Sequence, residues 1–166
     1  MPDRTRTLKG AIAEAAVTLA ATRLGIATMK PSIEGRRYDL ILDVGPRLLR
    51  VQCKWGTRRG DAVVVRLGTS RLTPQGYVST TYSAEEIDGF AVYCEHTGEC
   101  YWLPIEEFGG RSYAHLRLAP ARNGQRLLVK FAADHPFGAV AQLGERLAGS
   151  QKVRGSSPLS SIDEAA

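Results

Sequence analysis

The stretch from Tyr38 to Trp55 constrains the fold more than any other part of the sequence. Tyr38–Val44 and Leu48–Trp55 are rich in apolar residues in short runs, as β-strands are. The turn-forming sequence Asp-Val-Gly-Pro lies between them, so the two strands should form an antiparallel pair. Alternation of side chains along the second strand places Gln52 and Lys54 on one face. The sequence therefore predicts a central strand pair with polar side chains gathered on it.

Helical periodicity predicts one long helix near the start of the chain. Apolar residues recur at helical spacing over Thr7–Leu24, alanine fills most of the rest, and Gly25 ends the pattern. Shorter elements are expected further along: a basic turn at Gly56–Gly60, helical turns beginning at Ser83 and Pro104, and strands at Asp61–Leu67, Phe90–Cys94, Cys100–Leu103 and Leu127–Phe131. Together these elements predict an α/β fold with a central mixed β-sheet flanked by helices.

Length and composition describe a single globular domain. The chain has 166 residues, enough for one domain with a hydrophobic core and too few for two. No apolar run approaches the length that crosses a bilayer, and the polar N-terminus lacks the apolar stretch of a signal peptide. We therefore expect a cytoplasmic protein with no membrane partner.

Basic residues are concentrated in one part of the chain. The formal net charge is +5, and between Arg36 and Arg71 nine basic residues accompany only three acidic ones. Such a concentration suits a polyanionic partner such as nucleic acid. A solvated basic surface, produced by the arginine codons of a GC-rich genome, is the alternative interpretation.

Asp39, Gln52 and Lys54 carry the chemistry of the predicted strand pair. Antiparallel pairing brings Asp39 near the other two, so that a carboxylate, an amide oxygen and an ammonium converge. Mg²⁺ takes oxygen ligands and keeps several waters, so Asp39, the Gln52 side chain and the backbone carbonyl of Cys53 would suffice to hold it. The metal would make hydroxide available from a bound water, and Lys54 could orient that water or stabilise charge on phosphorus. The trio therefore predicts phosphodiester hydrolysis.

These residues resemble the PD-(D/E)XK nuclease superfamily. Asp39 and the Gln52-Cys-Lys54 segment are similar to its second and third motif positions, and Glu14 on the first helix precedes them. The likeness is greatest to bacterial group I intron-encoded homing endonucleases, in which glutamine replaces the usual acid before x-Lys. Further similar stretches, within a likeness that covers about residues 7 to 135, are Lys9–Ala16, Arg37–Asp39, Tyr82–Asp88, Phe90–Cys94 and Leu103–Ile105.

The resemblance implies a restriction-endonuclease-like core and an active site made of Glu14, Asp39, Gln52 and Lys54. It also implies Mg²⁺ as cofactor with Mn²⁺ as a substitute, double-stranded DNA as substrate, a dimer or tetramer, and action at the nucleoid of a bacterial cell. The sequence departs from the superfamily pattern at two positions: Tyr38 stands where the motif has proline, and Gln52 lacks a charge, which should weaken metal binding. Holliday-junction resolution and catalytically silent DNA binding are the alternative functions.

Five arginines outside this set are candidates for contacts with DNA phosphates. They are Arg36, Arg58, Arg59, Arg66 and Arg71. The aromatic residues Trp55 and Tyr77 are interpreted as packing residues and not as partners for stacked bases.

The composition changes from residue 138 onward to Gly, Ser, Gln and Arg with little periodicity. We therefore divide the chain into an endonuclease-like domain at residues 1–137 and a low-structure tail at residues 138–166. Back-translated, Arg154–Pro158 can match the T-arm consensus of a tRNA gene, and Ala141–Arg146 can match a D-arm. Either the reading frame runs through a tRNA gene, or this is an ordinary disordered tail.

Overall fold

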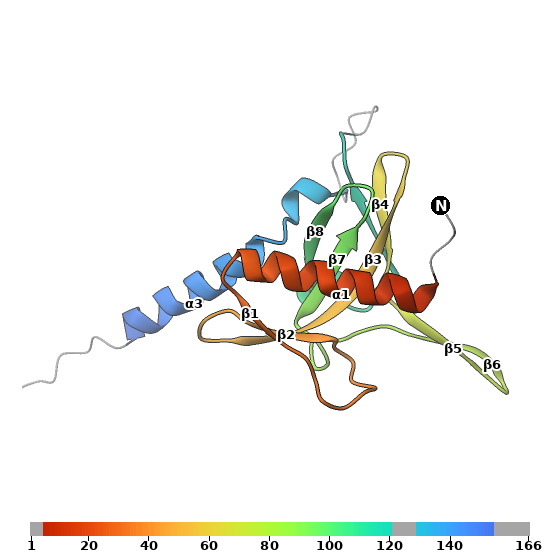
Figure 1. The fold of residues 1–166 in the computed structure, drawn as a ribbon, viewed down its shortest axis with the longest axis horizontal. Coiled ribbons are helices and arrows are strands. Elements are labelled where there is room, and N and C mark those ends of the chain that lie inside the picture. Colours follow the sequence, from red (N-terminus) through yellow and green to blue (C-terminus); the bar gives the residue numbers. More distant parts are fainter. Residues whose placement is uncertain (1–4, 121–128, 155–166) are drawn as a thin grey trace, which may run out of the picture.

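One mixed β-sheet forms the centre of the structure, and the long helix α1 lies across one of its faces (Figure 1). The structure is a computed structural model that describes residues 5–120 and 129–154. The helices are α1 (Arg6–Arg23), α2 (Ile105–Phe108) and α3 (Ala139–Arg154), with a 3-10 turn, η1, at Ala132–Asp134. The strands are β1 (Ala27–Met29), β2 (Leu40–Asp43), β3 (Leu48–Arg59), β4 (Ala62–Arg66), β5 (Thr69–Thr73), β6 (Gly76–Thr80), β7 (Gly89–Cys94), β8 (Glu99–Pro104), β9 (Tyr113–Arg117) and β10 (Lys130–Phe131). This arrangement confirms the predicted α/β fold with a central mixed sheet.

Three features favour helix α1: a capping side chain at its N-terminus, many alanines, and a stripe of buried residues along one face. The Thr5 hydroxyl accepts a hydrogen bond from the backbone N–H of Leu8 (3.3 Å). Ala13 and Val17 are buried one helical turn apart, and their small side chains let the helix lie close to the sheet. The helix predicted over Thr7–Leu24 is confirmed, displaced by one residue.

Strand β3 occupies the middle of the sheet and has different neighbours along its two edges. On one edge it pairs parallel with β7, over Val51–Gly56. On the other edge it pairs antiparallel first with β2, over Leu48–Val51, and then with β4, over Gly56–Arg59. Between these two partners, no described strand pairs with the stretch from Gln52 to Trp55 on that edge. We call this stretch the β3 gap, and the candidate site forms there.

The structure agrees with most of the predicted strands and corrects one turn. Strands β2, β4, β7 and β8 lie where strands were expected, and β7 and β8 pair as a hairpin. The basic turn expected at Gly56–Gly60 is wrong, because β3 continues to Arg59 and the chain turns at Gly60, whose φ is 56°. Part of the strand expected over Leu127–Phe131 lies outside the described residues, and β10 covers its end. No sequence signal predicts β9 or the polar hairpin β5–β6.

Helix α3 begins inside the core. Val140 is fully buried, and Leu143, one turn further along, packs against the cluster of apolar residues that lies under α1. Gly144 passes so close to the Val44 carbonyl that an added Cβ would stand 2.4 Å from its oxygen. Little structure was expected from residue 138 onward, and over Ala139–Arg154 that expectation is wrong, because apolar residues one turn apart fix the start of a helix.

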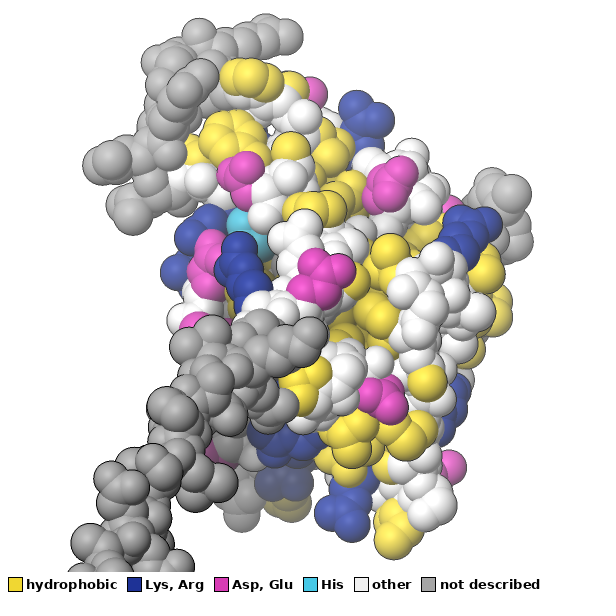
Figure 2. Space-filling view, turned by 90° about the vertical axis from the view of Figure 1, so that its left-hand side faces the viewer, with side chains coloured by type: hydrophobic (Ala, Val, Ile, Leu, Met, Phe, Trp, Pro, Cys, Tyr) yellow, Lys and Arg dark blue, Asp and Glu magenta, His cyan; other side chains and the backbone are white. Residues whose placement is uncertain are grey.

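The end of the molecule from which α3 leaves has mixed surface chemistry. Figure 2 shows this face, with hydrophobic, basic and acidic side chains interspersed on it. Residues 155–166, with most of the tRNA-like stretch Arg154–Pro158, lie outside the described residues. Among the helices of the described ranges, none is long and apolar enough to span a membrane.

Gly89 allows β7 and β8 to approach closely. A Cβ at this position would stand 2.4 Å from the Trp102 ring and 2.9 Å from the Leu103 carbonyl oxygen. We expect Gly89→Ala to lower the free energy of unfolding by about 1–3 kcal/mol, because a buried ring and the backbone must shift. Urea denaturation followed by tryptophan fluorescence measures this change. Gly10→Ala is the control, since nothing lies within 4 Å of its added methyl group and alanine favours a helix, so the protein should become more stable.

Candidate active site

Asp39 and Gln52 meet at the β3 gap. Asp39 stands immediately before β2, and its backbone N–H donates to the Val51 carbonyl (2.9 Å), which fixes it opposite the gap. Its Oδ2 accepts hydrogen bonds from the Cys53 N–H (2.8 Å) and from the Gln52 side-chain amide. The Cys53 carbonyl lies on the same edge and accepts from Gln52 Nε2 at 3.4 Å. The structure thus brings a carboxylate, an amide and a backbone carbonyl together.

Burial makes Asp39 harder to ionise than an exposed aspartate. Removal from water raises its pKa, while the hydrogen bond from the Cys53 N–H acts in the opposite direction. The negative charge of Glu14 raises the pKa of Asp39 further, and the positive charge of Lys54 lowers it. Because the net result is a raised pKa, this carboxylate has too little positive charge around it, and a cation bound there would favour its ionised form.

Lys54 lies next to this cluster with its ammonium over an aromatic ring. Its Nζ is 5.0 Å from the centroid of the Tyr82 ring, which is buried and packs edge-on against Phe90 at 5.4 Å. Burial lowers the pKa of Lys54 to about 8, the Asp39 carboxylate raises it, and two nearby arginines lower it further. Lys54 is therefore a half-buried ammonium that holds its proton less firmly than an exposed lysine does.

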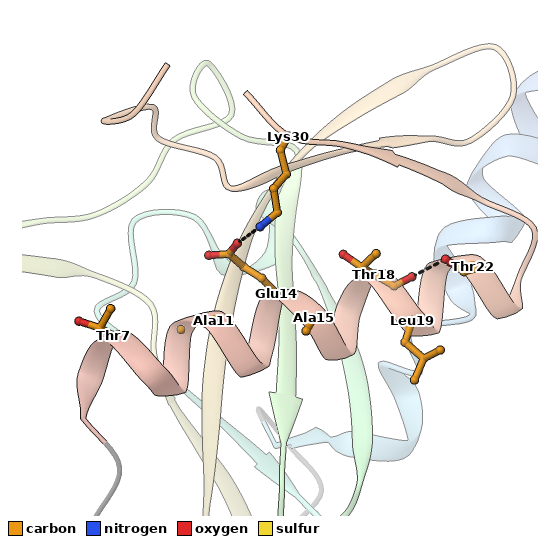
Figure 3. Close-up of a pocket in the computed structure, with 9 residues that line it drawn as sticks. Thr7, Ala11, Glu14, Ala15, Thr18, Leu19, Thr22 and Lys30 are labelled. Carbon is orange, nitrogen blue, oxygen red and sulfur yellow. Dashed lines mark hydrogen bonds and ion pairs between the residues drawn. The ribbon is translucent and has the colours of Figure 1, made fainter. Parts of the chain in front are cut away.

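Glu14 lies beside the cluster and not within it. It lines a pocket of about 740 Å³ along α1, and its Oε2 accepts a hydrogen bond from Lys30 Nζ at 2.7 Å (Figure 3). No hydrogen bond joins Glu14 to Asp39 in the described chain, but its negative charge raises the pKa values of both Asp39 and the Cys53 thiol. Of the four predicted site residues, Asp39, Gln52 and Lys54 therefore lie together at the sheet, whereas Glu14 lies on helix α1. Glu14 is paired with Lys30, which was not predicted from the sequence.

Arg37 is a residue of the site that sequence reasoning missed. Its guanidinium forms two hydrogen bonds with the Glu86 carboxylate (2.9 and 3.3 Å) and one with the Thr81 carbonyl (2.6 Å). It lies 3.8 Å from the centroid of the Tyr82 ring, the same ring that Lys54 contacts. Both segments, Arg37–Asp39 and Ser83–Glu86, can be recognised in the sequence. Nothing in either segment indicates that the two contact each other.

Arg50 shares a face of β3 with Gln52 and Lys54 but is fully engaged within the protein. Asp88 Oδ2 accepts hydrogen bonds from the Arg50 N–H (2.8 Å) and from its Nε (3.2 Å). The Arg50 guanidinium also donates to the carbonyls of Ala84 and Glu85. Arg50 therefore anchors the segment before β7 to β3 and helps to fix the position of the site.

Two of the five arginines predicted to contact DNA lie beside the site. The charge of Arg66 lowers the pKa of Lys54, so the two cations are near neighbours. Arg71, on the exposed hairpin β5–β6, lines a pocket of about 540 Å³ together with Arg37. These positions suit contacts with phosphates on either side of a phosphate bound at the site.

The other three predicted arginines are more distant or lie in a loop. Arg58 and Arg59 lie at the end of β3, roughly 20 Å along the strand from Gln52. Arg36 is exposed in the loop before β2. The five arginines therefore do not form one compact patch, although a DNA duplex is long enough to reach both ends of β3.

The groups at the β3 gap fit Mg²⁺ by their chemistry. Two are oxygen ligands of the kind that Mg²⁺ prefers, namely the Asp39 carboxylate and the Cys53 carbonyl. The third is the Gln52 side-chain amide, whose nitrogen contacts both of them and whose oxygen a half-turn of the amide would bring to the same place. Burial raises the pKa of the Cys53 thiol, so its sulfur is not available as a thiolate. Residues 5–120 and 129–154 hold no cluster of three or more His, Cys, Asp and Glu side chains that could bind a metal. The gap therefore suits a hard cation that keeps part of its water shell.

Comparison with known proteins agrees with this fold. The family model of the PD-(D/E)XK endonucleases matches residues 5–138. The fold is similar to the solved structure of a bacterial homing endonuclease, I-Ssp6803I, with a TM-score of 0.72 and 24% sequence identity, over 89% of this chain and 99% of that chain. No curated protein matches the sequence. The expected restriction-endonuclease-like core is thereby confirmed, and the chain belongs to the PD-(D/E)XK endonuclease family.

Proposed function

We propose that the chain is a metal-dependent endonuclease that hydrolyses phosphodiester bonds in double-stranded DNA. The observation that carries this proposal is the meeting of the Asp39, Gln52 and Cys53 groups at the β3 gap, with the Lys54 ammonium beside them. Membership of an endonuclease family supports the same chemistry. The arginines near the site supply the positive charge that a phosphate backbone needs.

Mg²⁺ is the proposed cofactor, held by the Asp39 carboxylate, the Gln52 side-chain oxygen and the Cys53 carbonyl. Mn²⁺ should substitute, because carboxylate and carbonyl oxygens also suit that ion. When bound, the ion would polarise the scissile phosphate and would make hydroxide available at neutral pH. A half-turn of the Gln52 amide about its last side-chain bond would place the oxygen where the nitrogen now contacts Asp39, and the oxygen could then serve as a ligand.

The protein's own side chains orient the reactants and stabilise charge. Lys54 donates hydrogen bonds to a phosphate oxygen and stabilises the negative charge that develops as the bond to phosphorus forms. Arg37 and Arg66 hold the neighbouring phosphates, and the contacts of Arg37 with Glu86 fix its guanidinium in advance. Glu14 supplies a second carboxylate on the helix side, where it can orient a water.

A homing or other mobile-element role is the more specific proposal. It rests on the glutamine variant of the motif, on the tRNA-like coding of the tail, and on the structural likeness to a bacterial homing endonuclease. Each chain has one candidate site in its described part, whereas a duplex has two strands to cut. We therefore propose a dimer or tetramer as the cutting unit, which light scattering of the protein on DNA would measure.

Cleavage of a DNA library that contains tRNA genes tests the proposed function. The wild type should cut linear duplexes with Mg²⁺ or Mn²⁺ and should not cut in EDTA. Cutting of four-way junctions but not of linear duplexes would identify a Holliday-junction resolvase instead. Salt-sensitive binding without any cutting would identify a catalytically silent DNA-binding protein, with the uncharged Gln52 as the suspected cause.

Arg66→Ala should weaken binding to all duplexes alike. One phosphate contact is lost, so the slope of log affinity against log salt should become shallower by about one unit. Fluorescence anisotropy over a series of NaCl concentrations measures the slope. Arg23→Ala, an exposed arginine at the end of α1, is the matched control and should leave the slope unchanged. A wild-type slope in the Arg66 variant would remove this residue from the DNA interface.

A further inference from the structure

Hairpin β5–β6, Thr69–Thr80, stands apart from the central sheet. Its two strands pair with each other and with no other described strand, and the hairpin projects from the body of the molecule (Figure 1). A two-stranded ribbon has little stability of its own in water, because it lacks a face that it can bury. The packing of the domain therefore does not account for this projecting element.

The tip of the hairpin exposes apolar surface. Leu72 is 70% exposed and Tyr77 is 78% exposed, which makes them the two most exposed large hydrophobic side chains of the described residues. They are direct cross-strand partners, so both point to the same face of the ribbon. The expectation that Tyr77 packs inside the protein is therefore wrong. An apolar pair at the end of a projecting ribbon is typical of a binding surface.

The base of the hairpin adjoins the candidate site. Arg71 and neighbouring threonines of the hairpin line a pocket together with Arg37. Arg66 donates a hydrogen bond from Nη2 to the Ser70 hydroxyl (2.6 Å). Arg37 and Arg66 are the two arginines whose charges lower the pKa of Lys54. A DNA strand with a phosphate at Lys54 would therefore pass directly beside the hairpin.

The charge and shape of this region favour DNA as the partner of the hairpin. The sequence has no Asp or Glu between Asp61 and Glu85, so the hairpin presents arginine, hydroxyl, amide and apolar groups without an acid. A two-stranded β-ribbon fits the major groove, where thymine methyl groups offer apolar contacts and base edges accept hydrogen bonds. A contact between two copies of the chain would bury the same apolar pair, but it would not use the exposed Arg71 of the hairpin, which lies on the pocket shared with Arg37.

We propose that hairpin β5–β6 enters the major groove beside the scissile phosphate and selects the target sequence. Leu72 and Tyr77 contact base edges and thymine methyl groups, and Arg71 contacts a phosphate at the rim of the groove. The proposal rests on the proposed function for the identity of the polymer, but it concerns the choice of sequence and not hydrolysis.

Sequencing of bound and of cut DNA from a randomised duplex library tests this proposal. The double variant Leu72→Ser/Tyr77→Ser is compared with the wild type and with Leu48→Ser, a similarly exposed leucine of the β2–β3 hairpin. We expect the double variant to lose its preference at a short block of base pairs beside the cut, by roughly tenfold or more per base pair. Its binding to non-target DNA at low salt should stay within about threefold of the wild type, and Leu48→Ser should keep the full preference.

Several outcomes would overturn the role of the hairpin. Unchanged preferences in the double variant, or an equal loss for target and non-target DNA, would place sequence selection elsewhere. A change in oligomeric state by light scattering, without a change in preference, would make the hairpin a contact between copies of the chain. If the wild type binds DNA without cutting it, only the proposed hydrolysis is refuted, and the preferences of the bound DNA still decide the role of the hairpin. If the wild type binds no DNA, both proposals are refuted.

Discussion

Asp39→Asn should abolish cleavage and yet leave the metal-free protein at least as stable as the wild type. The asparagine side chain has the same shape and keeps an oxygen for the Cys53 N–H, which now donates to Asp39 Oδ2 at 2.8 Å. It removes the only carboxylate in the donor set at the β3 gap. Mutation of a residue that only supports a metal ligand typically lowers metal affinity or activity by about 10–100-fold. Loss of the charged ligand itself should therefore lower the rate of cleavage by more than about 100-fold.

The expected gain in stability follows from the raised pKa of Asp39. The carboxyl group ionises more readily in the unfolded chain than in the folded protein, where burial disfavours its charge. The free energy of unfolding therefore falls as the pH rises through the window between the ordinary pKa of aspartate and the raised folded value, and it stays lower above that window. The asparagine of the variant has no such titration, so at neutral pH the variant escapes this loss.

Two measurements on the same samples check this pair of effects. Thermal unfolding in EDTA from pH 4 to pH 8 should show the wild type losing stability relative to Asp39→Asn as the pH rises, and cleavage with Mg²⁺ should be absent in the variant. Asp43→Asn, an exposed carboxylate at the other end of β2, is the matched control and should retain activity. Full cleavage by Asp39→Asn would contradict the assigned ligand, and a marked loss of its stability at pH 8 would contradict the raised pKa.

The central part of the site could be predicted because its signals are local. The alternation along β3 and the turn between β2 and β3 are properties of a short stretch of sequence, and they suffice to bring Asp39 opposite Gln52 with Lys54 on the same face. The oxygen chemistry of these side chains then indicates the class of cation. Only the extent of β3 was wrong, because a basic Gly-Thr-Arg-Arg-Gly sequence can continue a strand when a partner strand such as β4 pairs with it.

The remaining parts of the site depend on contacts between distant segments. The β3 gap exists because β2 begins and β4 ends at particular points along β3, and no local pattern sets either point. Arg37 and Glu86 meet across a separation of 49 residues, and Glu14 is paired with Lys30, which follows β1. Hairpin β5–β6 was not predicted from the sequence, because a stretch of serines and threonines with few apolar residues is typical of a loop.

Lys54→Met should reduce the rate of cleavage by about 10²–10³-fold while DNA binding at moderate salt stays close to that of the wild type. A hydrogen-bond donor that stabilises charge developing in the transition state typically contributes a rate factor of this size. Such a donor contributes little to binding of the ground state, so DNA binding should change little. Lys54→Arg should not restore the rate, because the planar guanidinium does not place its donors where the ammonium does. Lys130→Met is the matched control, since Lys130 pairs with Glu107, which belongs to another cluster.

The same substitution should stabilise the metal-free protein at neutral pH. The pKa of Lys54 is lowered to about 8 from an ordinary value of 10.5, so between these pH values the unfolded chain binds a proton that the folded protein has released. The free energy of unfolding of the wild type should therefore rise, relative to that of Lys54→Met, as the pH increases through this window. Below pH 8 the buried charge is present in full, and the methionine variant should be more stable by on the order of 1–2 kcal/mol, because solvent near the half-buried ammonium reduces the full effect.

Urea denaturation in EDTA at pH 7 and pH 10, paired with single-turnover cleavage at pH 7, separates the two roles of Lys54. If Lys54→Met is more stable at pH 7 but cuts slowly, Lys54 contributes to catalysis and lowers the stability of the fold, as expected for a half-buried functional group. If Lys54→Met were less stable and equally active, Lys54 would instead be a packing residue held by the Tyr82 ring. Burial disfavours the charges of both the Lys54 ammonium and the Asp39 carboxylate more than their mutual attraction favours them, so an anionic phosphate at Lys54 and a cation at Asp39 would both be bound favourably.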